Sequence, residues 1–278
     1  MSTDATSHVK DADFFHLPNG TEEGWIVEIP QPFEAIGIPL HVTKFMILEL
    51  VAALLIIAIF VPLARRIITG ERPRGKFWNF FEAILMFLRD QVARPVIGKA
   101  DADRYLPYIW TVFFFILFCN LLGMIPWCGS PTGAWACTLV LAVASLVIVF
   151  GTGMRKYGPI GYFLSLMPHM DLPFAMKIII IPLMGPMIVA IEVLGVLIKH
   201  FVLSVRLLAN MFAGHLVLAT IVGFLGATAG TSLWYGVLPA SLLGAVALSM
   251  LELFVAFLQA YIFTFLSALF IGMALHPH

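Results

Sequence analysis

Apolar residues dominate this chain in long runs that short polar segments separate. The first run covers residues 45–64, and an uncharged stretch at 105–149 follows later. A turn rich in proline and glycine at 126–131 divides that stretch into runs of about 105–125 and 133–153. Because a helix needs about 20 apolar residues to cross a bilayer, each of the three runs predicts one membrane span.

Two later runs are much longer than one span requires. Residues 174–225 and 237–275 are almost entirely apolar, and a segment rich in Gly, Ala, Ser and Thr separates them. Helices of this length fit a bilayer only when they tilt strongly or partly follow its surface. We therefore predict an all-α polytopic membrane protein with five membrane-embedded helices, the last two forming a long, strongly tilted antiparallel hairpin.

The segments before the second span have other patterns. Within residues 75–97, apolar side chains recur at helical spacing between charged ones, which predicts an amphipathic helix at the membrane surface. These side chains are Phe77, Phe80, Phe81, Ile84, Phe87 and Leu88. Residues 1–43 hold seven carboxylates and one lysine, so we predict an exposed, extended, acidic arm outside the cytoplasm, followed by a membrane domain at 44–278.

Composition supports a membrane protein. Hydrophobic residues make up 61% of the chain and charged residues 12%, whereas soluble domains carry about 25% charged residues. The net charge of zero gives no sign of nucleic-acid binding. The three cysteines form no CxxC pair, so we interpret them as packing residues and expect neither a metal nor a cofactor.

Basic residues predict the orientation of the spans. The segment 65–104 holds nine Lys or Arg against five acids, and Arg155 and Lys156 mark a second basic end. The loops at 126–132 and 226–236 hold no charged residue. By the positive-inside rule, the two basic segments are cytoplasmic and the N-terminus is outside, so that five spans leave the C-terminus inside.

Arg206 is the candidate functional residue with the strongest physical argument. From 207 to 278 the only Asp, Glu, Lys or Arg is Glu252, so Arg206 begins a stretch that is nearly free of charge. A guanidinium at this depth costs at least roughly 2.5–3.5 kcal/mol, and it cannot escape by losing its proton. The charge is therefore expected to hold a carboxylate or to block the passage of cations.

The hairpin places further polar residues at two heights. If the last two runs pair around residue 233, Gln259 lies level with Arg206, and Glu252 lies level with His215. The two levels are about 10–14 Å apart along the helices. His215 and Glu252 both titrate near physiological pH when burial or a partner shifts them, so together they are candidates for passing protons from an outer aqueous cleft.

A polar stripe follows one face of the fourth span. Glu192, Lys199 and Arg206 are each seven residues apart, and Asn210 continues the series, which places them within about 80° on a helix. Such a stripe predicts a water-accessible seam against a partner. Structural roles remain open for several of these residues: Lys199 as a snorkelling side chain, Glu192 as an internal pairing group, and Asn210 and Gln259 as interhelical hydrogen-bonding groups.

These residues carry a resemblance to a known family. SVRLLANMFAGH at 204–215 resembles the signature of subunit a of F-type ATP synthases. NLLGMIP at 120–126 and LQAYIF at 258–263 resemble that family's motifs in the central hairpin and the final helix. The resemblance extends from about residue 40 to the end, although Phe201 and Leu208 replace the Pro and Phe common in the family.

The resemblance implies a proton-translocating stator subunit with two offset half-channels beside a rotating ring of c subunits. Arg206 matches the arginine that faces the ring carboxylates and separates the half-channels. Asn210 and Gln259 match family positions directly. His215 and Glu252 match with acid and imidazole exchanged relative to some bacterial members, in the manner of mitochondrial-type ones.

The resemblance also implies partners and a location. The partners are the c ring, the b-subunit peripheral stalk, the rest of the complex and membrane lipid, and the subunit is no enzyme by itself. The acidic arm lacks the Arg-rich pattern of a transit peptide, which favours a bacterial cytoplasmic (inner) membrane over a mitochondrial inner membrane.

Two other functions compete with this interpretation. A stand-alone secondary transporter is disfavoured because the chain has no internal repeats. A haem-binding subunit is disfavoured because His200 and His215 share one helix, and no second helix offers a matching pair. The ion-binding carboxylate would lie on another chain, so both proton and sodium fit.

Overall fold

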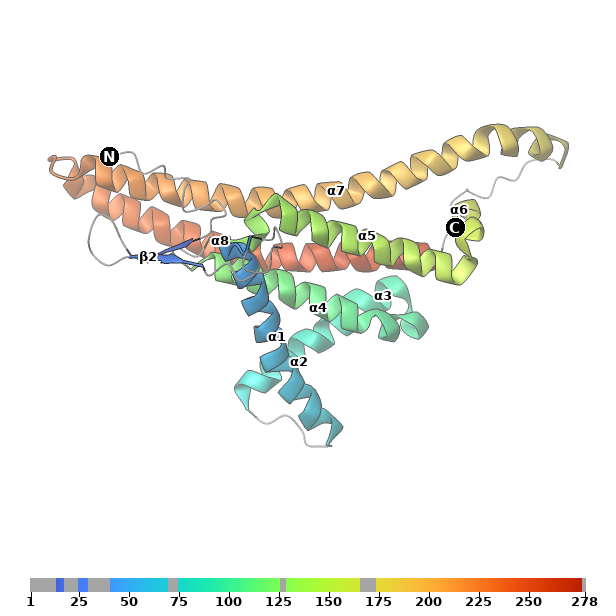
Figure 1. The fold of residues 1–278 in the computed structure, drawn as a ribbon, viewed down its shortest axis with the longest axis horizontal. Coiled ribbons are helices and arrows are strands. Elements are labelled where there is room, and N and C mark those ends of the chain that lie inside the picture. The colour runs from blue at the N-terminus through green and yellow to red at the C-terminus, as the bar shows by residue number, and fades with distance from the viewer. Residues whose placement is uncertain are drawn as a thin grey trace. The chain divides into compact units, whose positions relative to one another are not determined.

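The computed structural model describes residues 14–17, 25–29, 41–69, 75–125, 129–165 and 174–276. This part of the chain is mostly helical (Figure 1). It contains five helices that are long and apolar enough to cross a membrane, which confirms the predicted class. These helices are α1 (Lys44–Ile68), α4 (Lys99–Gly123), α5 (Trp135–Tyr157), α7 (Phe174–Thr228) and α8 (Trp234–Leu275).

Some helices extend beyond the apolar runs that predict them. Helix α4 begins at Lys99, six residues before the predicted start at 105, because a helical backbone satisfies its own hydrogen bonds whether or not its side chains are apolar. At the predicted turn, residues 126–128 lie outside the described part, and the 3₁₀ helix η3 covers Pro131–Gly133.

The predicted amphipathic helix is present but is not uniform. It consists of α2 (Lys76–Phe87), a π-helical turn η2 (Leu88–Ala93) and α3 (Arg94–Ile97). Inserted π turns change which side chains face a neighbouring element. Here Arg94 pairs with Asp90 at 3.0 Å and with Asp103 of α4 at 3.6 Å. The indole Nε1 of Trp110 in α4 also donates to the Leu85 carbonyl at 3.2 Å.

Helices α7 and α8 have 55 and 42 residues, or roughly 80 and 60 Å of contour at 1.5 Å per residue. Both exceed the bilayer core of about 30 Å, and their tilt remains a prediction. The non-helical connection covers only residues 229–233, and Gly230 provides its positive φ of 86°. The break predicted at 223–236 was too long, because Gly and Ala stay helical where lipid offers the backbone no other hydrogen-bond partner.

Two features were not predicted. Strands β1 (Phe14–Leu17) and β2 (Trp25–Glu28) pair antiparallel, with Phe14 opposite Glu28. The rest of the predicted acidic arm before residue 41 lies outside the described residues except for Ile29, and the side of the membrane that it occupies remains a prediction. A short helix α6 (Pro159–Ser165) follows α5.

The chain forms two compact units, and four of the long helices contribute to both. The first unit comprises Met1–Trp78, Thr111–Thr138 and Arg206–Tyr261, and the second comprises Asn79–Trp110, Leu139–Val205 and Ile262–His278. In the second unit, Lys156 Nζ and Tyr157 Oη both donate to the Leu275 carbonyl, at 2.7 and 2.9 Å. These bonds tie the end of α5 to the end of α8.

Candidate functional site

Arg206 lies on an exposed face of α7 in the first unit. Its neighbours Leu203 and Leu207 are buried, whereas Arg206 itself and Asn210, one turn further on, are exposed. Among the residues that the structure describes, none forms an ion pair or a hydrogen bond with the Arg206 guanidinium. Because arginine stays protonated, this side chain presents a permanent charge to whatever covers this face.

Asn210 and Gln259 join the two long helices in the first unit. Asn210 Nδ2 donates to Gln259 Oε1 at 2.9 Å, and the Gln259 side chain is buried. Gln259 Nε2 is buried and has no hydrogen-bond partner within the described part of the chain. This N–H group can therefore donate to a water molecule, or to an acceptor that lies outside the described residues.

The sequence predicts that Gln259 lies level with Arg206, whereas its hydrogen bond is to Asn210, one helical turn further along α7. Helical side chains lean towards the N-terminus of their own helix, and the two helices run in opposite directions. The two side chains therefore reach towards each other across a backbone offset, so Gln259 meets Asn210 rather than Arg206. The prediction compared only the heights of the two backbones and did not include the direction of the side chains.

Glu252 lies against the backbone of α7 at Gly214. It is buried at 7% exposure, and a Cβ atom placed on Gly214 would lie only 2.8 Å from Glu252 Oε1. Any larger residue at 214 would displace the carboxylate. Residue 214 immediately precedes His215, whose side chain is outside the described set. Gly214 is therefore a residue that the sequence argument missed, although it stands beside the predicted pair.

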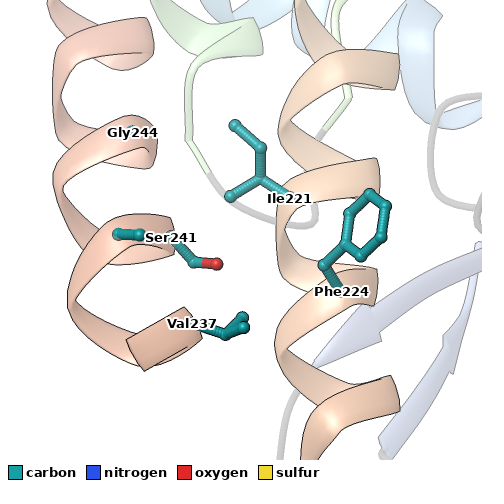
Figure 2. Close-up of a pocket in the computed structure, with 6 residues that line it drawn as sticks. Ile221, Phe224, Val237, Ser241 and Gly244 are labelled. Atoms are coloured by element: carbon teal, nitrogen blue, oxygen red, sulfur yellow. The ribbon is translucent and has the colours of Figure 1, made fainter. Parts of the chain in front are cut away.

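The same two helices line a groove near their connection. Ile221 of α7 points towards Gly244 of α8, and a shallow apolar groove lies between the helices there (Figure 2). It is lined by Ile221, Phe224, Val237, Ala240, Ser241 and Gly244. In the first unit, α7 therefore approaches α8 at three places: Asn210 at Gln259, Gly214 at Glu252 and Ile221 at Gly244.

Glu192 and Lys199 lie in the second unit, on the earlier part of α7. Glu192 is half-buried and Lys199 is exposed, with its ammonium 5.9 Å from the centre of the Phe270 ring. Burial raises the pKa of the Tyr162 hydroxyl above its usual range, and the charge of Glu192 raises it further. Tyr162, on the unpredicted helix α6, is therefore within electrostatic reach of Glu192.

The match to a known protein family decides the chain's affiliation. The family model described as ATP synthase A chain matches residues 46–272, which include every site residue named above. The chain belongs to the ATP synthase A chain family.

Several relatives within the ATP synthase A chain family are similar over most of this chain. ATP synthase subunit a of Myxococcus xanthus is 40% identical over 264 residues, covering 94% of this chain and 82% of the relative. The subunit of Chloroherpeton thalassium is 35% identical over 274 residues, covering 98% and 76%. One Anaeromyxobacter relative is 38% identical over 240 residues, and the aligned part spans about half of its length, 55%.

The structure places four of the predicted residues in the first unit. Asn210 and Gln259 are in contact, and Glu252 lies beside the residue before His215. Arg206 is exposed on the same stretch of α7. Glu192 and Lys199 belong to the other compact unit.

Proposed function

We propose that this chain is the proton-translocating stator subunit of an F-type ATP synthase. It provides two offset half-channels to a ring of c subunits, and Arg206 separates them. One observation carries the proposal: Arg206 is exposed on an apolar helix and has no ion-pair partner among the described residues. A cation at membrane depth needs a compensating group, so the partner is expected on another chain.

The proposed partner is a carboxylate on the ring. A guanidinium near a carboxylate stabilises its charged form and so favours release of its proton. Arg206 cannot itself accept a proton, which prevents leakage straight from one half-channel to the other. The transmembrane potential contributes about 2.3 kcal/mol per charge for each 100 mV, which drives the ring in one direction.

The remaining polar residues form the proton path on either side of Arg206. His215 and Glu252 receive protons on the outer side, where Glu252 is buried beside Gly214. Asn210 and Gln259 supply a polar level near Arg206. Gln259 Nε2, which has no partner among the described residues, is suited to bind a water molecule or a carboxylate oxygen. Glu192 and Lys199 belong to the inner path, where Tyr162 is within electrostatic reach of Glu192.

The proposed setting follows from the charge distribution. The chain lies in a bacterial cytoplasmic (inner) membrane with its acidic N-terminal arm outside and its C-terminus inside. Its partners are the c ring, the b-subunit peripheral stalk and the rest of the complex. The basic end of α5 at Arg155 and Lys156 then faces the cytoplasm.

The test is to purify the tagged chain in mild detergent and to follow ion movement. A ring of small hairpin proteins and the ATP-hydrolysing subunits should co-purify with it. Inverted membrane vesicles should acidify when ATP is added, and the acidification should not depend on sodium. A chain that purifies without a ring would contradict the proposal, and transport of sodium in place of protons would contradict the choice of ion.

A further inference from the structure

A buried network of three polar side chains joins the turn after α4 to the middle of α8. Thr132 Oγ1 donates to Asn120 Oδ1 at 2.7 Å, and Asn120 Nδ2 donates to the Ala256 carbonyl at 3.2 Å. Ser130 Oγ lies 2.8 Å from Thr132 Oγ1. Asn120 and Thr132 are fully buried, Ser130 is 4% exposed, and all four residues belong to the first unit.

The order of donors in this network follows from the number of protons available. A threonine hydroxyl has one proton, and Thr132 gives it to Asn120. Ser130 must therefore donate to Thr132. Because Asn120 Oδ1 receives the Thr132 proton, the amide group is oriented with Nδ2 towards α8. The network thus runs in one direction, from the turn to the helix.

Ser130, which carries one of the two hydroxyls, packs directly against Gly123. A Cβ atom on Gly123 would clash with Ser130 Cβ and would lie 2.9 Å from its Cα. Only glycine leaves room for this approach, and Gly123 is the last residue of α4. Ser130 is therefore held close to the end of α4, three residues after Asn120 on that helix.

The carbonyl that receives the bond lies between two proposed path residues. Ala256 is four residues after Glu252 and three before Gln259, so the three lie on one face of α8. All three are buried. Inside a helix this carbonyl already accepts the backbone N–H of residue 260, so the helix itself does not require the Asn120 bond. The bond instead restrains the height and rotation of α8 relative to α4.

We infer that Asn120 is a positioning residue that holds this segment of α8 so that Glu252 and Gln259 face α7. Its orientation is set by Thr132 and Ser130. None of the three side chains titrates in the physiological range, so they act on the path through geometry and exchange no protons with it. The inference rests on the proton-translocating function proposed above.

The experiment compares isosteric substitutions in the assembled complex. Thr132→Val removes the donor to Asn120, whereas Thr132→Ser keeps it. Thr138→Val is the matched control, because Thr138 is also buried. Within the described part of the chain its hydroxyl bonds to the carbonyls of Ala134, just before α5, and of Trp135, in the first turn of α5. ATP-driven acidification per assembled complex should fall about five- to tenfold in Thr132→Val. It should stay within about twofold of the unmodified protein in the other two variants.

A second measurement does not depend on proton transport. Hydrogen–deuterium exchange of the peptide containing residues 252–260, measured in the purified complex, should be faster in Thr132→Val and unchanged in Thr132→Ser and Thr138→Val. If the chain proves not to move protons, the exchange difference still supports or contradicts the restraint by itself. Equal pumping and equal exchange in Thr132→Val and Thr138→Val would overturn the inference.

A milder variant covers the case in which Thr132→Val lowers the amount of subunit in the membrane. Ser130→Ala removes only the outermost donor and should reduce pumping and exchange protection in the same direction but less. Normal pumping together with normal exchange in Ser130→Ala would then overturn the inference. Equal losses in Thr132→Val and Thr132→Ser would do so as well, because the serine keeps the hydroxyl that the network needs.

Discussion

Arginine occurs in two contrasting settings in this protein. In the second unit, Arg89 and Arg94 lie at the π turn and α3, and they contact Asp90 and Asp103 at 3.0–3.6 Å. Two cations and two carboxylates therefore balance within the chain. In the first unit, Arg206 stands exposed on an apolar helix, and the described residues supply no carboxylate to it.

The difference separates charges that hold the fold from charges that serve a partner. The cluster around Arg94 joins η2 and α3 to the start of α4, and its members are partly exposed, so each pair stabilises the protein only modestly. The Arg206 guanidinium forms no hydrogen bond or ion pair with the residues that the structure describes. Its cost at membrane depth is therefore expected to be offset by a group on another chain.

The largest expected effect comes from Arg206. Both Arg206→Ala and Arg206→Lys should abolish ATP-driven acidification of vesicles while the subunit remains inserted. Alanine removes the charge, and lysine lacks the planar guanidinium and can lose its proton beside the path. The amount of subunit in the membrane, measured by immunoblot, serves as the control. Near-normal pumping by either variant would show that Arg206 is not needed for proton transport, and its contrast with the internally paired arginines would then have no functional meaning.

The next largest effect concerns His215 and Glu252. Either His215→Ala or Glu252→Ala should slow proton flux about tenfold or more without the complete block expected at Arg206. The exchanged double variant, His215→Glu with Glu252→His, should recover more flux than either single exchange, because it restores one acid and one imidazole. A double variant no better than the worse single one would show that the two residues are not functional partners.

A smaller effect is expected from the bond between Asn210 and Gln259. Its net value is about 0.5–1.5 kcal/mol, so Asn210→Leu and Gln259→Leu should each slow pumping several-fold. Because the two side chains share the bond, the double variant should be little worse than the worse single one. Fully additive losses would indicate that each residue acts separately, with water or the ring rather than with the other.

The sequence predicted the helices better than it predicted the contacts between them. Long apolar runs directly require spanning helices, so α1, α4, α5, α7 and α8 could all be anticipated. The ends of the helices were harder to predict. The charged residues at the start of α4 and the small residues at 223–228 remain helical, although neither belongs to an apolar run that predicts a span.

Three features of the structure could not be predicted from local sequence. The contact of Gly214 with Glu252, the seat of Ser130 on Gly123 and the π turn at 88–93 arise from how separate elements approach one another. No local pattern marks a glycine that is needed only for space. The pairing of Asn210 with Gln259 was one turn away from the predicted level because side-chain lean adds to backbone height.

The smallest expected effect is at Arg94, and it tests the other half of the comparison. Arg94→Ala breaks contacts with Asp90 and Asp103, and since these groups are 31–54% exposed, each contact is expected to contribute about 0.2–1 kcal/mol. The melting temperature of the purified complex should fall slightly, and less so at high salt because salt already screens the pairs. Pumping per assembled complex should remain unchanged. Arg94→Lys keeps the charge and should restore part of the lost stability. If Arg94→Ala instead blocked pumping at a normal amount of assembled complex, internal pairing would no longer distinguish structural arginines from functional ones, and the assignment of Arg206 by its lack of a partner would lose its support.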